Sequence, residues 1–400
     1  MRAVNRNGLT VAAFAGFILV AFGALALPRT IFEIGRLFLW TGAAKGNLFS
    51  GYGVGFIVGA LVSGSLAGSV GRKPLAAAAL VLSTLGHLLF GYLGPLPLGY
   101  RYFVLLVLNV GIGSGIGMLE GVLNALLVDL HPGRAPLFLN VGHGFFSVGA
   151  AVAPFTAGYL MKISWQWVFY LNAVVSLVLV VAFAVMVWPS SGHIEKLRFR
   201  NVMRLVRNWG FLIAVVSIAL VVGAELGLMS WIVEFIRVNR SFNISAVGVG
   251  LFLSYLSLAM LVGRFGYGFF AERVGSIGAL VVSGIGSGVC IALFLLVNSL
   301  PGAVVFVVLF GLFISGMNAT LIAYACEKFP ERVGTVSGLM TAAIGTGSAV
   351  FPNAIGRIAD AAGLGIGLWI CAVNLFIVAA IMLFVLGARN RAGRAAGTAG

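Results

Sequence analysis

The chain has 400 residues, of which 61% are hydrophobic and 9% charged, with a formal net charge of +15. A soluble protein of this length needs far more charge to cover its surface, so the composition excludes a water-soluble fold and indicates an integral membrane protein. The apolar runs are ~20 residues long and lack the alternation of barrel strands, so the spans are expected to be helices.

The basic residues lie in short loops between apolar runs, which is typical of cytoplasmic loops and not of nucleic-acid binding. Cys290, Cys326 and Cys371 all fall in apolar runs, which argues against a disulfide framework or a metal site. The sequence contains no P-loop and no His or Cys cluster with metal-ligand spacing. We therefore expect no enzyme activity and no cofactor.

The apolar runs predict an all-α membrane protein with twelve transmembrane helices in two six-helix bundles. The first run follows Arg2 and Arg6 as a signal peptide would, but no small-residue cleavage site follows it, so we expect a retained helix. The twelve spans are expected near residues 9–34, 47–70, 74–94, 101–129, 137–161, 166–188, 210–236, 245–270, 277–297, 302–326, 333–357 and 364–387.

A polar linker, 189–209, is expected to separate an N-terminal bundle, 1–188, from a C-terminal bundle with a short basic tail, 210–400. When both termini and this linker are placed on one side, that side carries most of the loop Lys and Arg residues. The excess of positive charge predicts a multi-pass protein of the cell membrane with both termini in the cytoplasm.

Two sequence repeats support the division into halves. The stretch from Gly111 to Leu160 recurs at a constant offset of 198 residues, which suggests two similar bundles. The offset pairs Gly113 with Gly311, Asp129 with Glu327, Pro132 with Pro330, Arg134 with Arg332, Gly149 with Gly347 and Pro154 with Pro352.

A glycine- and charge-containing loop follows the second and the eighth expected spans. These loops resemble the G-x-x-x-D-R-x-G-[RK] loop that the major facilitator superfamily carries at both places, and the resemblance implies that transporter fold for the whole chain. Gly68 and Ser69 replace the Asp-Arg of the first copy, so we expect a weaker cytoplasmic latch there, whereas the second copy keeps an acid. The residues expected to act in conformational gating are Gly64, Gly71, Arg72, Arg264, Gly268, Glu272 and Arg273.

The glycines of these loops are expected to let two helices approach closely. For Arg264, a structural ion pair near the cytoplasmic gate is expected ahead of contact with solute.

The fourth, fifth and seventh spans resemble the fucose/galactose/glucose–proton symporter family. The matching stretches are Gly113-x-x-x-Gly117-x-Leu119-Glu120-x-x-x-Asn124 and Gly223-Ala224-Glu225 with Ser230-Trp231-Ile232. The resemblance implies that Glu120 is the protonatable acid and that Asn124, Asn140 and Glu225 help to bind sugar hydroxyls, with His143 at a position where some members carry Gln. Ala24 stands where the fucose-transporting members carry an Asp, so coupling would rest on Glu120, on Glu225 or on neither.

The positions of the two acids support a role in transport. Glu120 lies nine residues before Asp129, about 13 Å from the cytoplasmic end, and Glu225 is also central in its span. An ionisable group at this depth is costly and usually faces a cavity or a partner, so both acids are candidates for proton coupling. The alternative is a structural carboxyl bonded to a neighbouring helix.

Other candidates for solute contact have structural alternatives. Asn318 occupies the position equivalent to Glu120 in the repeat, and Trp231 and Tyr324 are candidate sugar-stacking aromatics, although packing roles are commoner for such residues. Asn140 and His143 share a face that could line a cavity or join two helices.

These observations predict a secondary transporter of a small solute, a monosaccharide coupled to protons, that works by alternating access. A proton-linked exporter of drug-like compounds on the same fold is the alternative, and a non-transporting membrane scaffold is a third possibility. The expected partners are the solute, the proton and the lipid bilayer, and the expected oligomeric state is a monomer.

Overall fold

A computed structural model describes residues 5–93, 98–131, 134–189, 203, 205, 207–238, 244, 246–329 and 333–397. This part of the chain forms thirteen α-helices. They are α1 (Arg6–Leu37), α2 (Gly42–Val70), α3 (Arg72–Gly91), α4 (Leu98–Leu130), α5 (Ala135–Leu160), α6 (Gln166–Val185), α8 (Trp209–Val238), α9 (Ala246–Val274), α10 (Ser276–Leu296), α11 (Leu300–Ile314), α12 (Met317–Lys328), α13 (Val333–Ala362) and α14 (Leu364–Gly397).

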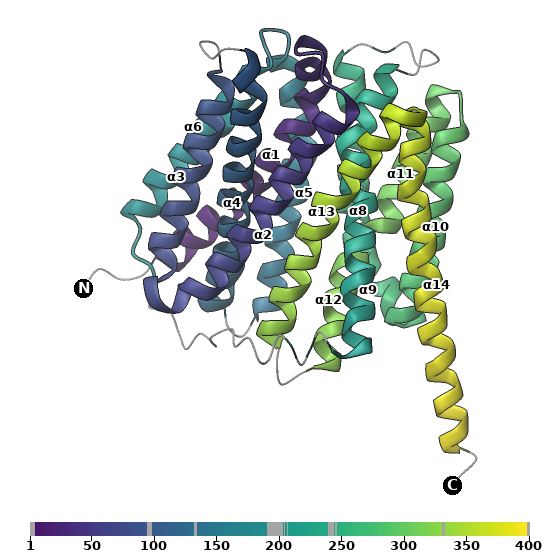
Figure 1. The fold of residues 1–400 in the computed structure, drawn as a ribbon. Helices are drawn as coiled ribbons and strands as arrows, with labels where there is room; N and C mark the ends of the chain where they lie inside the picture. The colour runs from purple at the N-terminus through teal and green to yellow at the C-terminus, as the bar shows by residue number, and fades with distance from the viewer. Residues whose placement is uncertain are drawn as a thin grey trace.

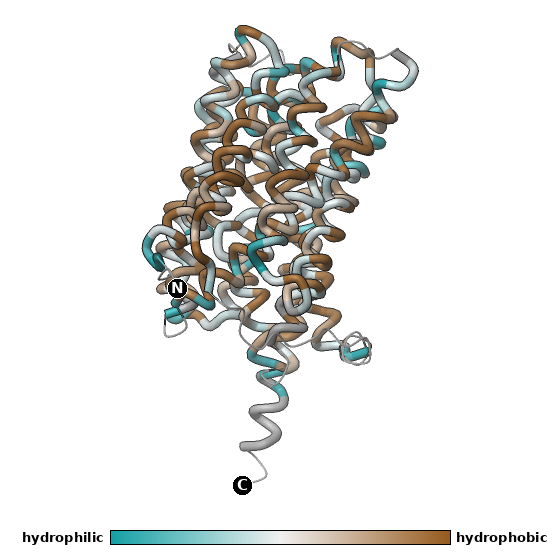
Figure 2. The backbone as a smooth tube through the Cα atoms, turned by 90° about the vertical axis from the view of Figure 1, so that its left-hand side faces the viewer, coloured by the Kyte–Doolittle hydropathy of each residue, from teal (hydrophilic) through white to brown (hydrophobic). Residues whose placement is uncertain are grey.

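The helices form two groups that lie side by side (Figure 1). The N-terminal group, α1–α6, and the C-terminal group, α8–α14, each pack mainly among themselves, and the most extensive contacts between them join α2 with α13, α5 with α9, and α1 with α8. Figure 2 shows hydrophobic residues along most of the bundle, whereas the C-terminal part of α14 extends beyond it. The predicted linker, 189–209, lies mostly outside the described residues.

Eleven spans in the described part are long and apolar enough to cross a membrane. Helices α11 and α12 together form one of them, Leu300–Lys328. The expected span near 333–357 corresponds to α13, which has 30 residues but is not among the eleven. Helix α13 lies between α2 and α8 and packs on both, so it needs small residues for close contact more than it needs apolar ones (Figure 1).

The tenth expected span is interrupted at Ser315 and Gly316, where α11 ends and α12 begins. The ring of Tyr267, on α9, occupies the space that a Cβ at Gly316 would need, so only glycine fits this close approach. The Ser315 carbonyl accepts a hydrogen bond from Nε of Arg264 at 3.4 Å. A break at mid-span therefore leaves a backbone carbonyl available to side chains of a neighbouring helix.

The two groups touch closely at one end of the bundle. We call this the sealed end; it is the end where α1 finishes and α2 starts. The Lys45 Nζ lies 2.5 Å from Glu234 Oε1, and Asp360 Oδ1 accepts from the Gly42 backbone N–H at 2.5 Å. Further bonds between the groups are Asp360 Oδ2 with Ala43 N (2.7 Å), Asn353 Nδ2 with Asn47 Oδ1 (2.7 Å), Ser50 Oγ with the Ala349 carbonyl (2.6 Å) and Arg237 Nη1 with Glu33 Oε1 (3.6 Å).

The groups part toward the opposite end, which we call the terminal end because α1 begins and α14 finishes there (Figure 1). A Cβ built on Gly46 or Gly53 would fall 2.8 or 2.7 Å from the backbone of α13. Nearer the terminal end, a Cβ at Gly64, Gly268 or Gly338 would meet nothing within 4 Å. The expectation that Gly64 and Gly268 allow close helix contact is therefore wrong for this conformation.

Candidate functional site

Glu120 and Asn124 are placed by direct packing of α4 on α2. A Cβ at Gly113 or Gly117 would collide with the backbone of Tyr52 or Phe56, so the two helices meet at van der Waals distance. Glu120 and Asn124 stand one turn apart on α4 and are partly exposed. The glycines thus hold the part of α4 that precedes Glu120 directly against α2.

Glu225 lies near the middle of α8 and is 6% exposed. Its Oε2 accepts a hydrogen bond from Nδ2 of Asn318, on α12, at 2.9 Å. Asn318 stands two residues after the helix break at Gly316. The structure therefore brings together two of the residues singled out in the sequence, both within the C-terminal group.

Arg264, on α9, connects the two groups. Its Nη1 donates to Ser147 Oγ at 2.7 Å and to the His143 carbonyl at 3.0 Å, both on α5. It interacts electrostatically with Glu225 and with Glu120, one acid from each group. Arg264 makes no ion pair within 4.0 Å with a carboxylate among the described residues, so the expected ion pair is replaced by bonds to neutral oxygens of α5.

Arg264 also marks the depth at which α5 and α9 separate. On the sealed side of this arginine, Ser254 Oγ donates to the Ala151 carbonyl at 2.8 Å, and a Cβ at Gly250 would lie 3.2 Å from the Pro154 carbonyl oxygen. On the terminal side, a Cβ at Gly268, one turn after Arg264 on the same face of α9, would meet nothing within 4 Å. The guanidinium thus lies at the inner limit of the opening between the groups.

Three polar atoms in this region are buried without a hydrogen-bond partner among the described residues. They are Tyr52 Oη, Asn124 Oδ1 and Asn318 Oδ1. A buried polar atom without a partner costs about 1–3 kcal/mol, so solvent or solute is expected to satisfy these atoms. We call Glu120, Asn124, Glu225, Arg264 and Asn318 the central polar set.

The remaining predicted contact residues lie elsewhere or are only partly described. The ring of His143 packs against Phe17 at 5.1 Å, while its carbonyl binds Arg264. Asn140 is on α5, but its side chain lies outside the described residues.

The two candidate stacking aromatics do not offer a free ring face near the acids in this conformation. Trp231 is 0% exposed; its Nε1 donates to the Pro352 carbonyl at 2.8 Å, and its ring contacts Phe49 at 5.6 Å, so it packs toward the sealed end. Tyr324 lies near the terminal end of α12, where Lys328 Nζ donates to its hydroxyl at 3.0 Å. The positions of Trp231 and Tyr324 favour a packing role for both rings over sugar stacking.

The two loop copies differ in how many contacts their charged residues make, and the first copy makes more of them. The first loop copy, which lacks the Asp-Arg pair, still forms an ion pair between Arg72 and Asp129, and Arg72 Nη1 also donates to the Ala125 carbonyl at 2.9 Å. Glu272 and Arg273 of the second copy are exposed and form no ion pair or hydrogen bond with another described residue. The first copy therefore has the closer contacts in this conformation, and a weaker latch at the closed terminal end stays a prediction.

The backbone conformation of the turn explains why the first loop carries a glycine at position 71. Gly71 has φ +90°, and Gly275 in the equivalent turn after α9 has φ +77°; both values lie in the region that L side chains rarely adopt. The two turns are thus alike in geometry as well as in sequence.

Sequence reasoning missed Tyr52 and the charged contacts of the sealed end, Lys45 with Glu234 and Asp360 with the start of α2. These partners are separated by 189 and by more than 300 positions, and no local pattern links them. The only available signal was the rarity of charge in an apolar chain.

The family model and the relatives that match this chain point to the same family. The family described as Major Facilitator Superfamily matches residues 8–352 and, in a second match, 229–399. The uncharacterized MFS-type transporter YfkL of Bacillus subtilis (strain 168) is 26% identical over 318 residues, 76% of each chain. The cis,cis-muconate transport protein of Acinetobacter baylyi (strain ATCC 33305 / BD413 / ADP1) is 23% identical over 294 residues, which cover 69% of this chain and 70% of that protein.

Solved structures show the same fold at low identity. A mutant of the nucleoside transporter NupG superposes with a TM-score of 0.78 at 14% identity, over 94% of this chain and 98% of that one. A D-xylose-proton symporter superposes with a TM-score of 0.77 at 13% identity, over 94% and 97%.

Proposed function

Because the chain belongs to the Major Facilitator Superfamily, we propose that this transporter carries a monosaccharide together with protons by alternating access. The observation that supports this best is that Glu120 and Glu225, which come from opposite helix groups, both interact with Arg264, an arginine that bonds across the interface. Protonation of an acid in such a place changes the attraction between the groups, which is what coupling to a conformational cycle requires.

The proposed roles follow from position. Glu120 takes up and releases the coupling proton from the partly exposed side of α4. Glu225, held by Asn318, and Asn124 would bind solute hydroxyls. The gating roles proposed for Gly64, Gly71, Arg72, Gly268, Glu272 and Arg273 concern closure of the terminal end.

We propose that the terminal end faces the cytoplasm, as the distribution of basic loop residues predicts, so that this conformation is open to the cytoplasm. The sealed end would then close the outer side with the Lys45–Glu234 ion pair and the bonds of Asp360. Sugar as the substrate class is supported by the resemblance to the fucose/galactose/glucose–proton symporters and by the printed title of the D-xylose-proton symporter.

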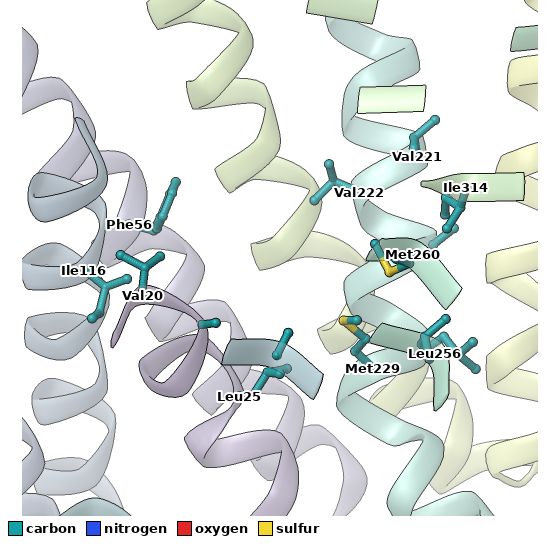
Figure 3. Close-up of a cluster of buried hydrophobic side chains, with 14 of the residues drawn as sticks. Val20, Leu25, Phe56, Ile116, Val221, Val222, Met229, Leu256, Met260 and Ile314 are labelled. Carbon is teal, nitrogen blue, oxygen red and sulfur yellow. The ribbon is translucent and has the colours of Figure 1, made fainter. Parts of the chain in front are cut away.

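Export of apolar organic compounds with protons is the second candidate. Figure 3 shows buried apolar side chains from both groups, among them Val20 and Phe56 of the N-terminal group and Val222 and Met260 of the C-terminal group. An apolar interior of this kind would suit a less polar solute than a sugar.

Uptake into proteoliposomes tests the proposal. We expect an inside-alkaline pH gradient to accelerate uptake of labelled D-glucose, D-galactose, L-fucose or D-xylose about tenfold. Glu120→Gln should abolish this acceleration and keep sugar exchange without a gradient, because the amide preserves the hydrogen bonds and removes the titration.

Glu327→Gln, a change at an exposed acid near the terminal end, serves as the matched control and should behave as the wild type. Uptake that ignores the gradient would refute proton coupling, and uptake of none of the four sugars would refute the substrate class. Proton-driven extrusion of a lipophilic dye, without sugar uptake, would favour the exporter.

A further inference from the structure

Arg264 has hydrogen-bonding capacity that the part of the chain described by the structure does not use. Nε binds the Ser315 carbonyl and Nη1 binds two oxygens of α5, whereas Nη2 has no hydrogen-bond partner among the described residues. Nη2 is also not one of the fully buried atoms. The edge of the guanidinium that carries Nη2 is thus available to a molecule entering between the groups.

The charge of Arg264 also has no carboxylate within ion-pair distance among the described residues. Each ion pair among the described residues lies toward one end of the bundle: Lys45, Arg36 and Arg237 pair near the sealed end and Arg72 near the terminal end. Arginine keeps its charge under all physiological conditions, so it cannot escape the cost of burial by losing a proton. A cation at this depth without a close carboxylate calls for an anionic partner.

Solute chemistry follows from this arrangement. We propose that the transported solute carries a carboxylate, which binds Arg264 through Nη2 while its hydroxyls bind Asn318 and Asn124. A guanidinium N–H donates a charge-assisted hydrogen bond to a carboxylate, and such a bond is about twice as strong as one between neutral groups. The solute class is therefore a small polyhydroxy acid, such as an aldonate or a uronate.

The state of the two acids decides when this carboxylate binds. With Glu120 and Glu225 both ionised, the two acids and Arg264 carry a net charge of −1, which repels an anion. With both protonated the net charge is +1, which attracts one. Protons and solute therefore load together, so the inference rests on the proposed proton coupling and specifies the solute that it serves.

A monoanion fits better than a dianion. Arg264 is the one cation of the central polar set, so a bound phosphate ester would leave a net negative charge in the interior of the bundle. The wild-type protein should accordingly bind sugar acids in preference to sugar phosphates.

Binding to the purified full-length protein at pH 5.5 and pH 8 tests the inference, with D-glucuronate, D-gluconate, D-glucose and D-glucose 6-phosphate as probes. We expect at least one of the two acids to bind about tenfold more tightly than D-glucose at pH 5.5, and to bind more weakly at pH 8. Tighter binding of D-glucose or of D-glucose 6-phosphate would overturn the proposal.

Arg264→Gln should lose the preference for the acid and retain any D-glucose binding, while Arg264→Lys should keep part of the preference as a point charge. Arg389→Gln, which changes an exposed arginine of α14, is the matched control. An equal loss of D-glucose and D-glucuronate binding in Arg264→Gln would show a structural role only and overturn the proposal.

If Arg264→Gln does not fold, the comparison of probes on the wild type still decides the question. Gradient-driven D-glucose uptake without affinity for either acid would leave the proposed function standing and refute this inference. Gradient-independent uptake of D-glucuronate that still requires Arg264 would support carboxylate recognition and refute proton coupling, whereas binding of none of the probes would refute this inference and leave the proposed function to the uptake assay.

Discussion

Two classes of charged residue stand out in this bundle. The first class lies near the ends and has close partners, as Lys45 has Glu234 at 2.5 Å, with side chains only 10% and 13% exposed. Those of the central polar set face one another without direct ion pairs. The first class is suited to holding one conformation, whereas the second is suited to binding a solute and protons that come and go.

The Lys45–Glu234 pair provides a test of the first class. Removing one partner leaves a nearly buried charge without compensation, so Lys45→Met and Glu234→Gln should each destabilise this conformation by about 3 kcal/mol. The double variant Lys45→Met/Glu234→Gln should recover most of that loss, because it removes both charges together. Thermal unfolding of the four proteins in detergent measures the coupling. Additive losses in the double variant would show that the two side chains do not act as a pair.

Among the helices, α2 shows two kinds of contact along one face. Gly46 and Gly53 lie against the backbone of α13, whereas Gly64 lies free of it. We therefore expect Gly53→Ala to force α2 and α13 apart and to lower the melting temperature by several degrees, because the new Cβ would lie 2.7 Å from a backbone atom. Gly64→Ala, on the same helix, is the matched control and should leave thermal stability within about 0.5 kcal/mol of the wild type. A similar loss in both variants would argue against the separation at the terminal end.

Sequence patterns predict most helices of this fold, because a membrane span must be long and apolar. Composition identifies α13 as a membrane span less clearly than the other helices. Its close contacts with α2 and α8 require small residues such as Gly345, Gly347 and Gly356. They do not predict the break at Gly316, which depends on Tyr267 from another helix. Depth in the membrane made Glu120 and Glu225 candidates, but the hydrogen bonds of Arg264 depend on how the two helix groups meet.

For the whole molecule, the register of α2 against α13 predicts the conformation not seen here. The helices run antiparallel, with Gly42 beside Gly356, Gly53 beside Ala349 and Ile57 beside Gly345. Continuing this register by two turns brings Gly64 opposite Gly338, and the spacing of seven residues keeps each of them on the face that already makes contact. Both positions are open in this conformation, so the terminal end can close by extending the same small-residue contact.

A disulfide between these positions tests that closure. In a background where Cys290, Cys326 and Cys371 are replaced by Ala, Gly64→Cys/Gly338→Cys should cross-link only when the terminal end closes, since a disulfide requires Cβ atoms roughly 4 Å apart. Cross-linking should then stop transport, and reduction should restore it, because one of the two alternating states is trapped. Gly64→Cys/Gly387→Cys, which places the second thiol on α14, is the matched control and should not cross-link. If the cross-linked protein transported its solute at the uncross-linked rate, α2 and α13 would not separate during the cycle. Rocking of the two helix groups would then not describe the transport motion.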